Sequence, residues 1–338
     1  VEITKNGPPE VMEITRSPID LPKEGEVLIR HKAIGVNFID VYYRNGIYPL
    51  ASLPGKIGHE ASGVVEAVGR GVKKFREGDR VAYVSPTPGS YCSSRSVPAE
   101  ILIKIPSEID FETAATMLLK GMTVHYLFTR TANLQKFHTI LFHAAAGGTG
   151  LIAMQWAKIL GTNVIGTVSS EEKVKLAKKF GANHVINYAR QDFVESVLEI
   201  SSGKGVDVVF DSIGQKTFYQ SLRCLKKYGL MVNSGSSALI LAIKSLGIKK
   251  NSEVIVPCLN FGTALSSILI CDLQPILIDI DIETLQIKIE DIEKNITKKT
   301  KLLLIPNLIG MVPDWGKIYK LAKKYNLRII EDSADTLG

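Results

Sequence analysis

The sequence lacks the features that mark secreted, membrane-spanning and zinc-cluster proteins. Its cysteines, Cys92, Cys224, Cys258 and Cys271, are widely spaced and include no CxxC pair, which argues against a disulfide scaffold and a zinc cluster. No uninterrupted apolar run approaches the roughly 20 residues of a membrane helix, and the first residues lack the basic and apolar regions of a signal peptide. These absences predict a cytoplasmic protein with no membrane partner.

The sequence also has no arginine-rich run and no stripe of interleaved basic and aromatic residues. The net charge of +7 comes from scattered side chains, so we expect no nucleic acid partner, and a basic surface suits a phosphorylated cofactor instead. With 338 residues, of which 45% are hydrophobic and 22% charged, the chain has the composition of a globular protein and the length for two or three domains.

The pattern of apolar runs changes twice along the chain. Residues 1–110 carry short β-rich runs broken by Gly and Pro, such as EVLIRHKAIGV and DRVAYV, which predict a β domain. Residues 111–235 alternate strands such as NVIGTV with helical segments such as EEKVKLAKKFGA, which predicts a doubly wound parallel sheet. Residues 236–338 continue an α/β alternation of different character, and we expect a third, partial α/β segment there.

A glycine-rich loop follows the strand TILFHAA and precedes the helical run LIAMQWAKILG. This strand, loop and helix match the GxGxxG dinucleotide fingerprint, with Ala145 in the first place. Glycine at the second place lets the backbone approach a pyrophosphate, and glycine at the third lets helix and strand pack closely. The predicted cofactor contacts in the loop are Ala146, Gly147, Gly148, Thr149 and Gly150.

The residues after the next strand decide which nicotinamide cofactor fits. An NAD enzyme would place Asp or Glu there to bind the ribose 2′-hydroxyl, whereas NVIGTV is followed by Ser169 and Ser170, with Lys173 just beyond. Hydroxyls and an ammonium favour a 2′-phosphate, and Tyr188 closes the third strand near the same place, so NADPH is the predicted cofactor. A solvated helix lysine is the alternative interpretation of Lys173.

Several motifs in order resemble the bacterial quinone oxidoreductases, relatives of zeta-crystallin in the medium-chain dehydrogenase/reductase superfamily. They are AIGVNFIDVYYRNGIYP, LPGKIGHEASGVVEAVG, LLKGMTVHYL and HAAAGGTGLIAMQWAKILG. The resemblance implies a GroES-like β domain and a Rossmann domain, NADPH as reductant, a quinone or α,β-enone substrate in the cleft between the domains, and a homodimer as one permitted assembly.

By the same resemblance, six side chains would line the cleft: Asn37, Asp40, Tyr42, Tyr48, Thr123 and Tyr126. Asn37, Tyr48 and Thr123 would act on the substrate. The Asn37 amide can form hydrogen bonds with polar groups of the cofactor or substrate, and a tyrosine hydroxyl can donate a hydrogen bond to a developing oxyanion. Asn37, Asp40, Tyr42, Tyr126 and Ser212 would contact the cofactor. For each tyrosine, simple packing is an equal alternative.

Zinc is not expected, although sister alcohol dehydrogenases use it. Gly58, His59 and Glu60 match their GHE motif, but Asn37 and Leu119 stand at the places of two cysteine ligands. A single histidine cannot hold a catalytic zinc ion, which takes about three protein ligands.

From about residue 233 the chain resembles the DegT-type pyridoxal-phosphate (PLP) sugar aminotransferases and dehydratases, through VIVPCLNF and RIIEDSADTLG. This resemblance implies a phosphate-binding helix start at Gly235, Ser236 and Ser237, a ring-stacking Phe261 and a pyridinium partner at Asp332. The alternatives are an N-cap, a core aromatic and a strand-end acid.

The two resemblances meet inside VNSGSSA, which suggests a join between two unrelated genes. Neither family pattern is complete: the first lacks its final Rossmann strand and the second its Schiff-base lysine, so we expect PLP at most at a remnant site. Three hypotheses follow: an NADPH-dependent oxidoreductase, a PLP-dependent sugar-nucleotide enzyme fragment, and a non-catalytic protein. The first hypothesis is supported by the largest number of residues. We expect the reductase activity of this chain to be lower than that of an intact relative.

Overall fold

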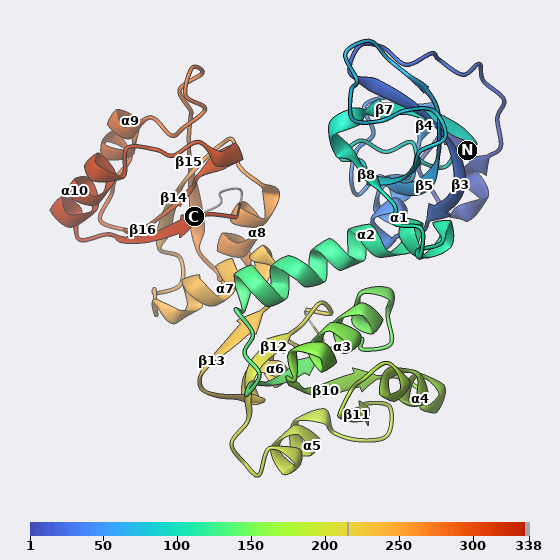
Figure 1. Ribbon diagram of the computed structural model, residues 1–338. Coiled ribbons are helices and arrows are strands. Elements are labelled where there is room, and N and C mark those ends of the chain that lie inside the picture. The colour runs from blue at the N-terminus through green and yellow to red at the C-terminus, as the bar shows by residue number, and fades with distance from the viewer. Residues whose placement is uncertain (215, 335–338) are drawn as a thin grey trace. The chain divides into compact units, whose positions relative to one another are not determined.

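The computed structural model describes residues 1–214 and 216–334. The chain divides into two compact units, Val1–Val208 and Val209–Gly338, shown from blue to yellow-green and from yellow to red in Figure 1. The boundary falls inside strand β12 (Val206–Phe210). The division at residues 110 and 235 that the sequence suggests stays a prediction.

The first unit begins with a β domain, as predicted. An antiparallel sheet has the order β7-β3-β5-β6-β8, and a smaller sheet has the order β2-β1-β4. Buried side chains that include Val27, Ile29, Val65 and Tyr83 form the core of the larger sheet. The strands are β1 (Glu2–Ile3), β2 (Met12–Glu13), β3 (Glu26–Gly35), β4 (Gly55–Lys56), β5 (Glu60–Val68), β6 (Arg80–Val84), β7 (Ser94–Pro98) and β8 (Leu102–Lys104).

Two helices that the sequence patterns did not reveal position the residues discussed below. Helix α1 (Phe38–Asn45) starts with a capping box between Asn37 and Asp40. It ends at Gly46, whose φ of 77° is left-handed and would strain a residue with a Cβ atom. Helix α2 (Phe111–Tyr126) begins where the Asp110 carboxylate accepts a hydrogen bond from the backbone N–H of Thr113 at 2.6 Å. Helix α2 packs on β3, β5 and α3 (Gly148–Leu160).

The predicted parallel strands of the nucleotide-binding fold are confirmed. Strand β10 (Asn163–Val168) pairs in parallel with β9 (Thr139–Phe142) on one side and with β11 (His184–Asn187) on the other. The sheet order is β11-β10-β9-β12-β13. Parallel neighbours require crossover helices, which are α3 (Gly148–Leu160) and α4 (Glu171–Lys179), while α5 (Phe193–Ile200) follows β11.

The second unit contains a parallel sheet with the order β15-β14-β16-β17. Alternate residues of the inner strand β14 (Glu253–Pro257) face opposite cores. Val254 and Val256 pack with α7 (Gly235–Ser245) and α8 (Gly262–Ile270), whereas Ile255 packs with α9 (Ile289–Lys294) and α10 (Trp315–Tyr325). Its elements are α6 (Phe218–Arg223), β13 (Leu225–Val232), α7 (Gly235–Ser245), β14 (Glu253–Pro257), α8 (Gly262–Ile270), β15 (Gln274–Ile278), α9 (Ile289–Lys294), β16 (Thr300–Pro306), α10 (Trp315–Tyr325) and β17 (Arg328–Asp332).

Among the helices of residues 1–214 and 216–334, none combines the length and the apolar composition that crossing a bilayer would need.

We predict that Ile255→Ala lowers the free energy of unfolding of the second unit by about 2–5 kcal/mol, because the Ile255 side chain on β14 is fully buried against the helices α9 and α10. The chain has two tryptophans, Trp156 on α3 and Trp315 on α10, so a Trp156→Phe background lets Trp315 fluorescence report urea unfolding of this unit. Ile282→Ala is the matched control, since Ile282 is 82% exposed. Equal midpoints for the two variants would contradict the prediction.

Candidate functional site: a dinucleotide loop and a buried polar cluster

The glycine-rich loop joins β9 to α3, in the context that the fingerprint predicts. Gly147 is the N-cap of α3, and Gly148 is its first residue. A Cβ atom on Gly150 would lie 2.4 Å from the carbonyl oxygen of Ala144 and 2.6 Å from that of Ala145, so only glycine fits at this place. Ala146 and Thr149 belong to the same turn, so all the predicted loop residues lie together.

The N-terminus of α3 supplies the electrostatics of an anion site. The first N–H groups of a helix have no acceptor within the helix, and they stand at the positive end of its dipole. Gly147 and Gly148 are exposed, so this end of the helix is accessible to a ligand, although the N–H of Gly147 itself already donates to the carbonyl of Ala144 at 2.8 Å. A dinucleotide pyrophosphate fits this geometry.

The predicted 2′-phosphate residues are also brought together, at the end of β10. Ser170 caps α4 by accepting a hydrogen bond from the backbone N–H of Lys173, whose Nζ donates to Ser169 Oγ at 3.4 Å. Tyr188 follows β11 and donates its backbone N–H to the carbonyl of Val168 at 3.0 Å, which places it beside the end of β10. Ser169 and Ser170 are half-buried and Lys173 is exposed, so these groups can reach a ligand.

Two charged residues that no sequence pattern indicated, Glu171 and Arg190, lie next to this cluster. Glu171 accepts a hydrogen bond from Asn187 Nδ2 at 2.8 Å and forms an ion pair with Arg190 at 3.5 Å. The positive charge of Arg190 therefore partly balances the negative charge of this carboxylate beside Ser170. Glu171 could have been identified from the sequence by its position directly after Ser170, at the first residue of α4.

In the β domain, Asp40 organises a network of buried hydrogen bonds. Its carboxylate accepts the Asn37 backbone N–H at 2.9 Å and the Tyr91 hydroxyl at 2.9 Å, and it lies 2.8 Å from His59 Nδ1. Burial and the charge of Asp40 raise the pKa of Tyr91 far above its usual range, so Tyr91 remains a donor. Asp40 is only 4% exposed and holds its neighbours in place from beneath the surface.

A second carboxylate, Glu60, is completely buried beside Asn37. Glu60 accepts hydrogen bonds from Asn37 Nδ2 at 2.7 Å and from the backbone N–H of Leu119 at 2.9 Å, and it forms an ion pair with Lys120 at 3.2 Å. Lys120 also donates to Asn37 Oδ1 at 2.6 Å. Residues of β5, α2 and the turn before α1 therefore meet at one charged centre, which no sequence pattern indicated.

Two of the three tyrosines predicted to line the cleft, Tyr42 and Tyr48, belong to an edge-to-face cluster of rings. The rings of Tyr42 and Tyr48 lie 5.4 Å apart in a T-shaped arrangement, and Phe38 contacts Tyr42 in the same way. Tyr126 is half-exposed at the end of α2, and Thr123 donates its hydroxyl to the carbonyl of Leu119 at 2.9 Å. The oxygen of Thr123 retains capacity to accept a hydrogen bond.

Ser212 belongs to the second unit and follows β12 as an exposed residue. The neighbouring Asp211 is buried, and its carboxylate accepts hydrogen bonds from the Ile213 backbone N–H at 2.9 Å and the Thr217 hydroxyl at 2.8 Å. These bonds give the turn that carries Ser212 a defined conformation.

The residues suggested for a PLP remnant also lie in the second unit. Gly235 opens α7, and Ser237 donates its backbone N–H to the Ser234 cap at 3.3 Å. Phe261 is the N-cap of α8 and is 66% exposed, while Asp332 ends β17. The side chain of Ser236 lies outside the described residues.

Residues 23–134 match the family described as the alcohol dehydrogenase GroES-like domain, residues 148–256 match the zinc-binding dehydrogenase family, and residues 216–338 match the DegT/DnrJ/EryC1/StrS aminotransferase family. Quinone oxidoreductase 1 of Escherichia coli K12 is 47% identical over 249 residues, which are 73% of this chain and 76% of that protein.

A 2-haloacrylate reductase from Burkholderia is 44% identical over 266 residues, covering 76% of this chain and 80% of that protein. The crystal structure of E. coli quinone oxidoreductase complexed with NADPH superimposes with a TM-score of 0.66 at 48% identity, over 69% of this chain and 71% of that one. The chain belongs to the quinone oxidoreductase family of GroES-like and Rossmann-fold proteins.

The donors around His59 do not fit the zinc ion of the matched dehydrogenase family. His59 Nδ1 forms a hydrogen bond with Asp40. His59 Nε2 is a buried nitrogen that has no hydrogen-bond partner among the described residues. Over the described part of the chain, no three His, Cys, Asp or Glu side chains gather as a metal site. Asn37 and the apolar Leu119 supply no thiolate, so these residues do not fit a catalytic zinc ion.

We predict less than about one zinc ion per ten chains after dialysis against zinc and then buffer, because a catalytic zinc site needs about three protein ligands. Elemental analysis measures the zinc content, and an intact zinc-dependent alcohol dehydrogenase treated in parallel is the positive control. One bound zinc per chain that survives dialysis would contradict the prediction.

Proposed function

We propose that this chain is an NADPH-dependent oxidoreductase that reduces quinones or α,β-enones without a metal. The observation that carries the proposal is the combination of the Gly150 turn before α3 with Ser169, Ser170 and Lys173 at the end of β10, which together suit a dinucleotide with a 2′-phosphate. The similarity to a quinone oxidoreductase crystallised with NADPH supports the same cofactor.

NADPH would supply the hydride, and the chain's own residues would bind and orient both partners. The α3 N-terminus and the loop from Ala146 to Gly150 would hold the pyrophosphate. For a quinone, the hydride of NADPH and one proton from solvent would together convert the quinone to the hydroquinone, and NADP⁺ would be the second product. Tyr48, 37% exposed at the edge of the aromatic cluster, and the Asn37 amide would donate hydrogen bonds to the oxygen that gains negative charge.

The direct test is steady-state oxidation of NADPH by the purified chain with 1,4-benzoquinone. We expect turnover that depends on both reactants and that falls to background in Gly150→Val, because the added side chain would collide with the carbonyl oxygens of Ala144 and Ala145. Folding of that variant is checked by circular dichroism. No turnover with a panel of quinones and enones, by a chain that is folded, would contradict the proposed activity.

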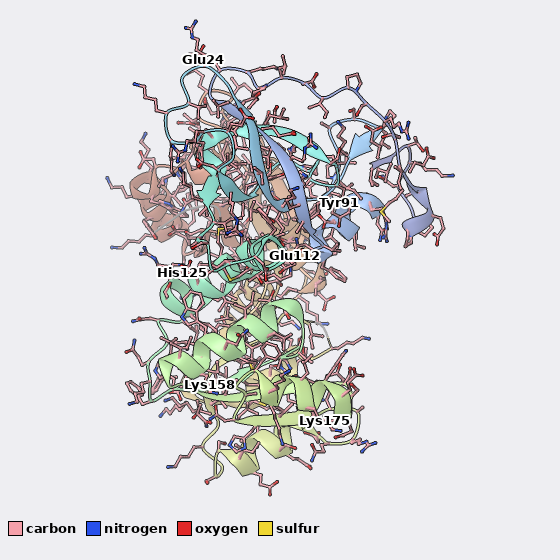
Figure 2. All side chains as sticks on the ribbon, turned by 45° about the vertical axis from the view of Figure 1, so that its right-hand side comes forward. Glu24, Tyr91, Glu112, His125, Lys158 and Lys175 are labelled. Atoms are coloured by element: carbon pink, nitrogen blue, oxygen red, sulfur yellow. The ribbon has the colours of Figure 1, made fainter. Side chains whose placement is uncertain are left out.

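We predict that the wild-type chain binds NADPH at least about tenfold more tightly than NADH, since a charge-assisted hydrogen bond to phosphate contributes about 1.5–3 kcal/mol. Lys173→Met should remove most of this preference without changing the affinity for NADH. Lys175→Met on the same helix is the matched control; Figure 2 labels Lys175 on α4. Fluorescence titration measures each dissociation constant, and equal affinities for the two cofactors in the wild type would show that Ser170, Lys173 and Tyr188 do not bind the phosphate.

For residues 236–338 we propose a remnant of a DegT-type fold with at most a weak PLP site. The family match over residues 216–338 supports it, as does the position of Asp332 at the carboxyl end of β17, two strands from β14 in the parallel sheet. The proposed contacts Gly235, Ser237, Phe261 and Asp332 include no amine for a Schiff base.

We therefore predict that added PLP gives no specific internal aldimine. Absorbance spectroscopy followed by borohydride reduction and peptide mapping tests this prediction, and the mapping separates random modification of surface lysines from a single site. One lysine modified at stoichiometric PLP in the second unit would contradict it.

A further inference from the structure

Lys120 is a basic residue of α2 that lies beside Asn37 and Glu60. Its side chain is 18% exposed, and its ammonium donates to Asn37 Oδ1 at 2.6 Å, to Glu60 Oε1 at 3.2 Å and, over a longer distance of 3.5 Å, to the backbone carbonyl of Val36. Glu60 is fully buried, so the ammonium balances a carboxylate that water cannot reach. The interaction is therefore much less screened than a surface ion pair.

The three side chains together determine which way the Asn37 amide faces. Asn37 Nδ2 donates to Glu60 Oε1 at 2.7 Å, while Oδ1 accepts from Lys120. The flipped amide would turn its NH₂ group toward the ammonium and its oxygen toward the carboxylate, which loses two hydrogen bonds and creates two repulsions. With Lys120 in place, one N–H of the amide remains available for a ligand.

The aliphatic part of Lys120 also reaches the dinucleotide loop. A Cβ atom on Gly148 would lie 2.9 Å from Lys120 Cε and 3.0 Å from Cδ, so this side chain passes directly over the first residue of α3. Helices α2 and α3 pack against each other. One lysine thus contacts both the residue expected to face the substrate and the helix end expected to bind the pyrophosphate.

We propose that Lys120 is a positioning residue for the reduction: it holds the Asn37 amide in one orientation and keeps that amide in register with the first turn of α3. This inference rests on the proposed NADPH-dependent activity. Lys120 acts through its contacts with the Asn37 amide and with the backbone at Gly148.

A double-mutant cycle between Lys120→Met and Asn37→Ala tests the proposal. We expect Lys120→Met to lower kcat with benzoquinone by about 10- to 100-fold and to weaken NADPH binding by about tenfold, and Lys120→Arg to recover part of both losses. Once Asn37 is alanine, Lys120→Met should lower kcat by no more than about threefold further, because there is no amide left to orient. Lys175→Met, the same change at an exposed position of α4, should stay within about twofold of the wild type.

Removing Lys120 alone leaves Glu60 buried without its countercharge, which can unfold the chain. The double variant Lys120→Met/Glu60→Gln removes both charges, and we expect it to fold while retaining the loss of kcat. The positioning role would be overturned if Lys120→Met lowered kcat by the same factor in the Asn37→Ala background as in the wild type. A folded Lys120→Met/Glu60→Gln variant with wild-type kcat would overturn it as well. If the wild type oxidises no NADPH, the proposed function fails, and the role of Lys120 is then decided by NADPH affinity alone: an unchanged dissociation constant in the folded variants would overturn it.

Discussion

The buried carboxylate of Glu60 is the constraint on which the first unit depends. A charge with no exposure to water is tolerated only when hydrogen bonds and a countercharge replace its hydration. Asn37, Leu119 and Lys120 provide these, and they come from the turn before α1 and from α2. Gly35 belongs to the same arrangement, because a Cβ there would lie 2.4 Å from Glu60 Cγ and 2.2 Å from the carbonyl oxygen of Ala115.

The site follows from this centre. Helix α2 is held against the β domain through Glu60, and it packs on α3, whose first turn carries the dinucleotide loop. Asp40 adds a second buried network that fixes the backbone at Asn37 and the ring of His59. Since Asn37 is held from both sides, its amide needs little reorganisation to meet a ligand, which is the condition for efficient electrostatic stabilisation.

Features that depend on neighbouring residues were predictable from the sequence, and features that depend on distant contacts were not. The strand, loop and helix around Gly147 and Gly150 are a local pattern, and the structure has them as predicted. The cluster of Glu60 and Lys120 joins residues 60 positions apart, so no spacing rule indicates it. Helix α2 was missed because threonines and a glycine weaken its helical signal, whereas contacts with β3, β5 and α3 stabilise it.

Hydrogen–deuterium exchange of the full chain with and without NADPH tests most directly whether the first unit binds the cofactor through these residues. Protection of residues 144–151, of residues 169–173 and of the segment of α2 around Lys120 is the predicted result, because backbone groups there would contact the cofactor or be held more rigidly by it. Protection confined to the second unit around α7 and α8, or no protection at a saturating concentration of NADPH, would contradict the assignment of the site.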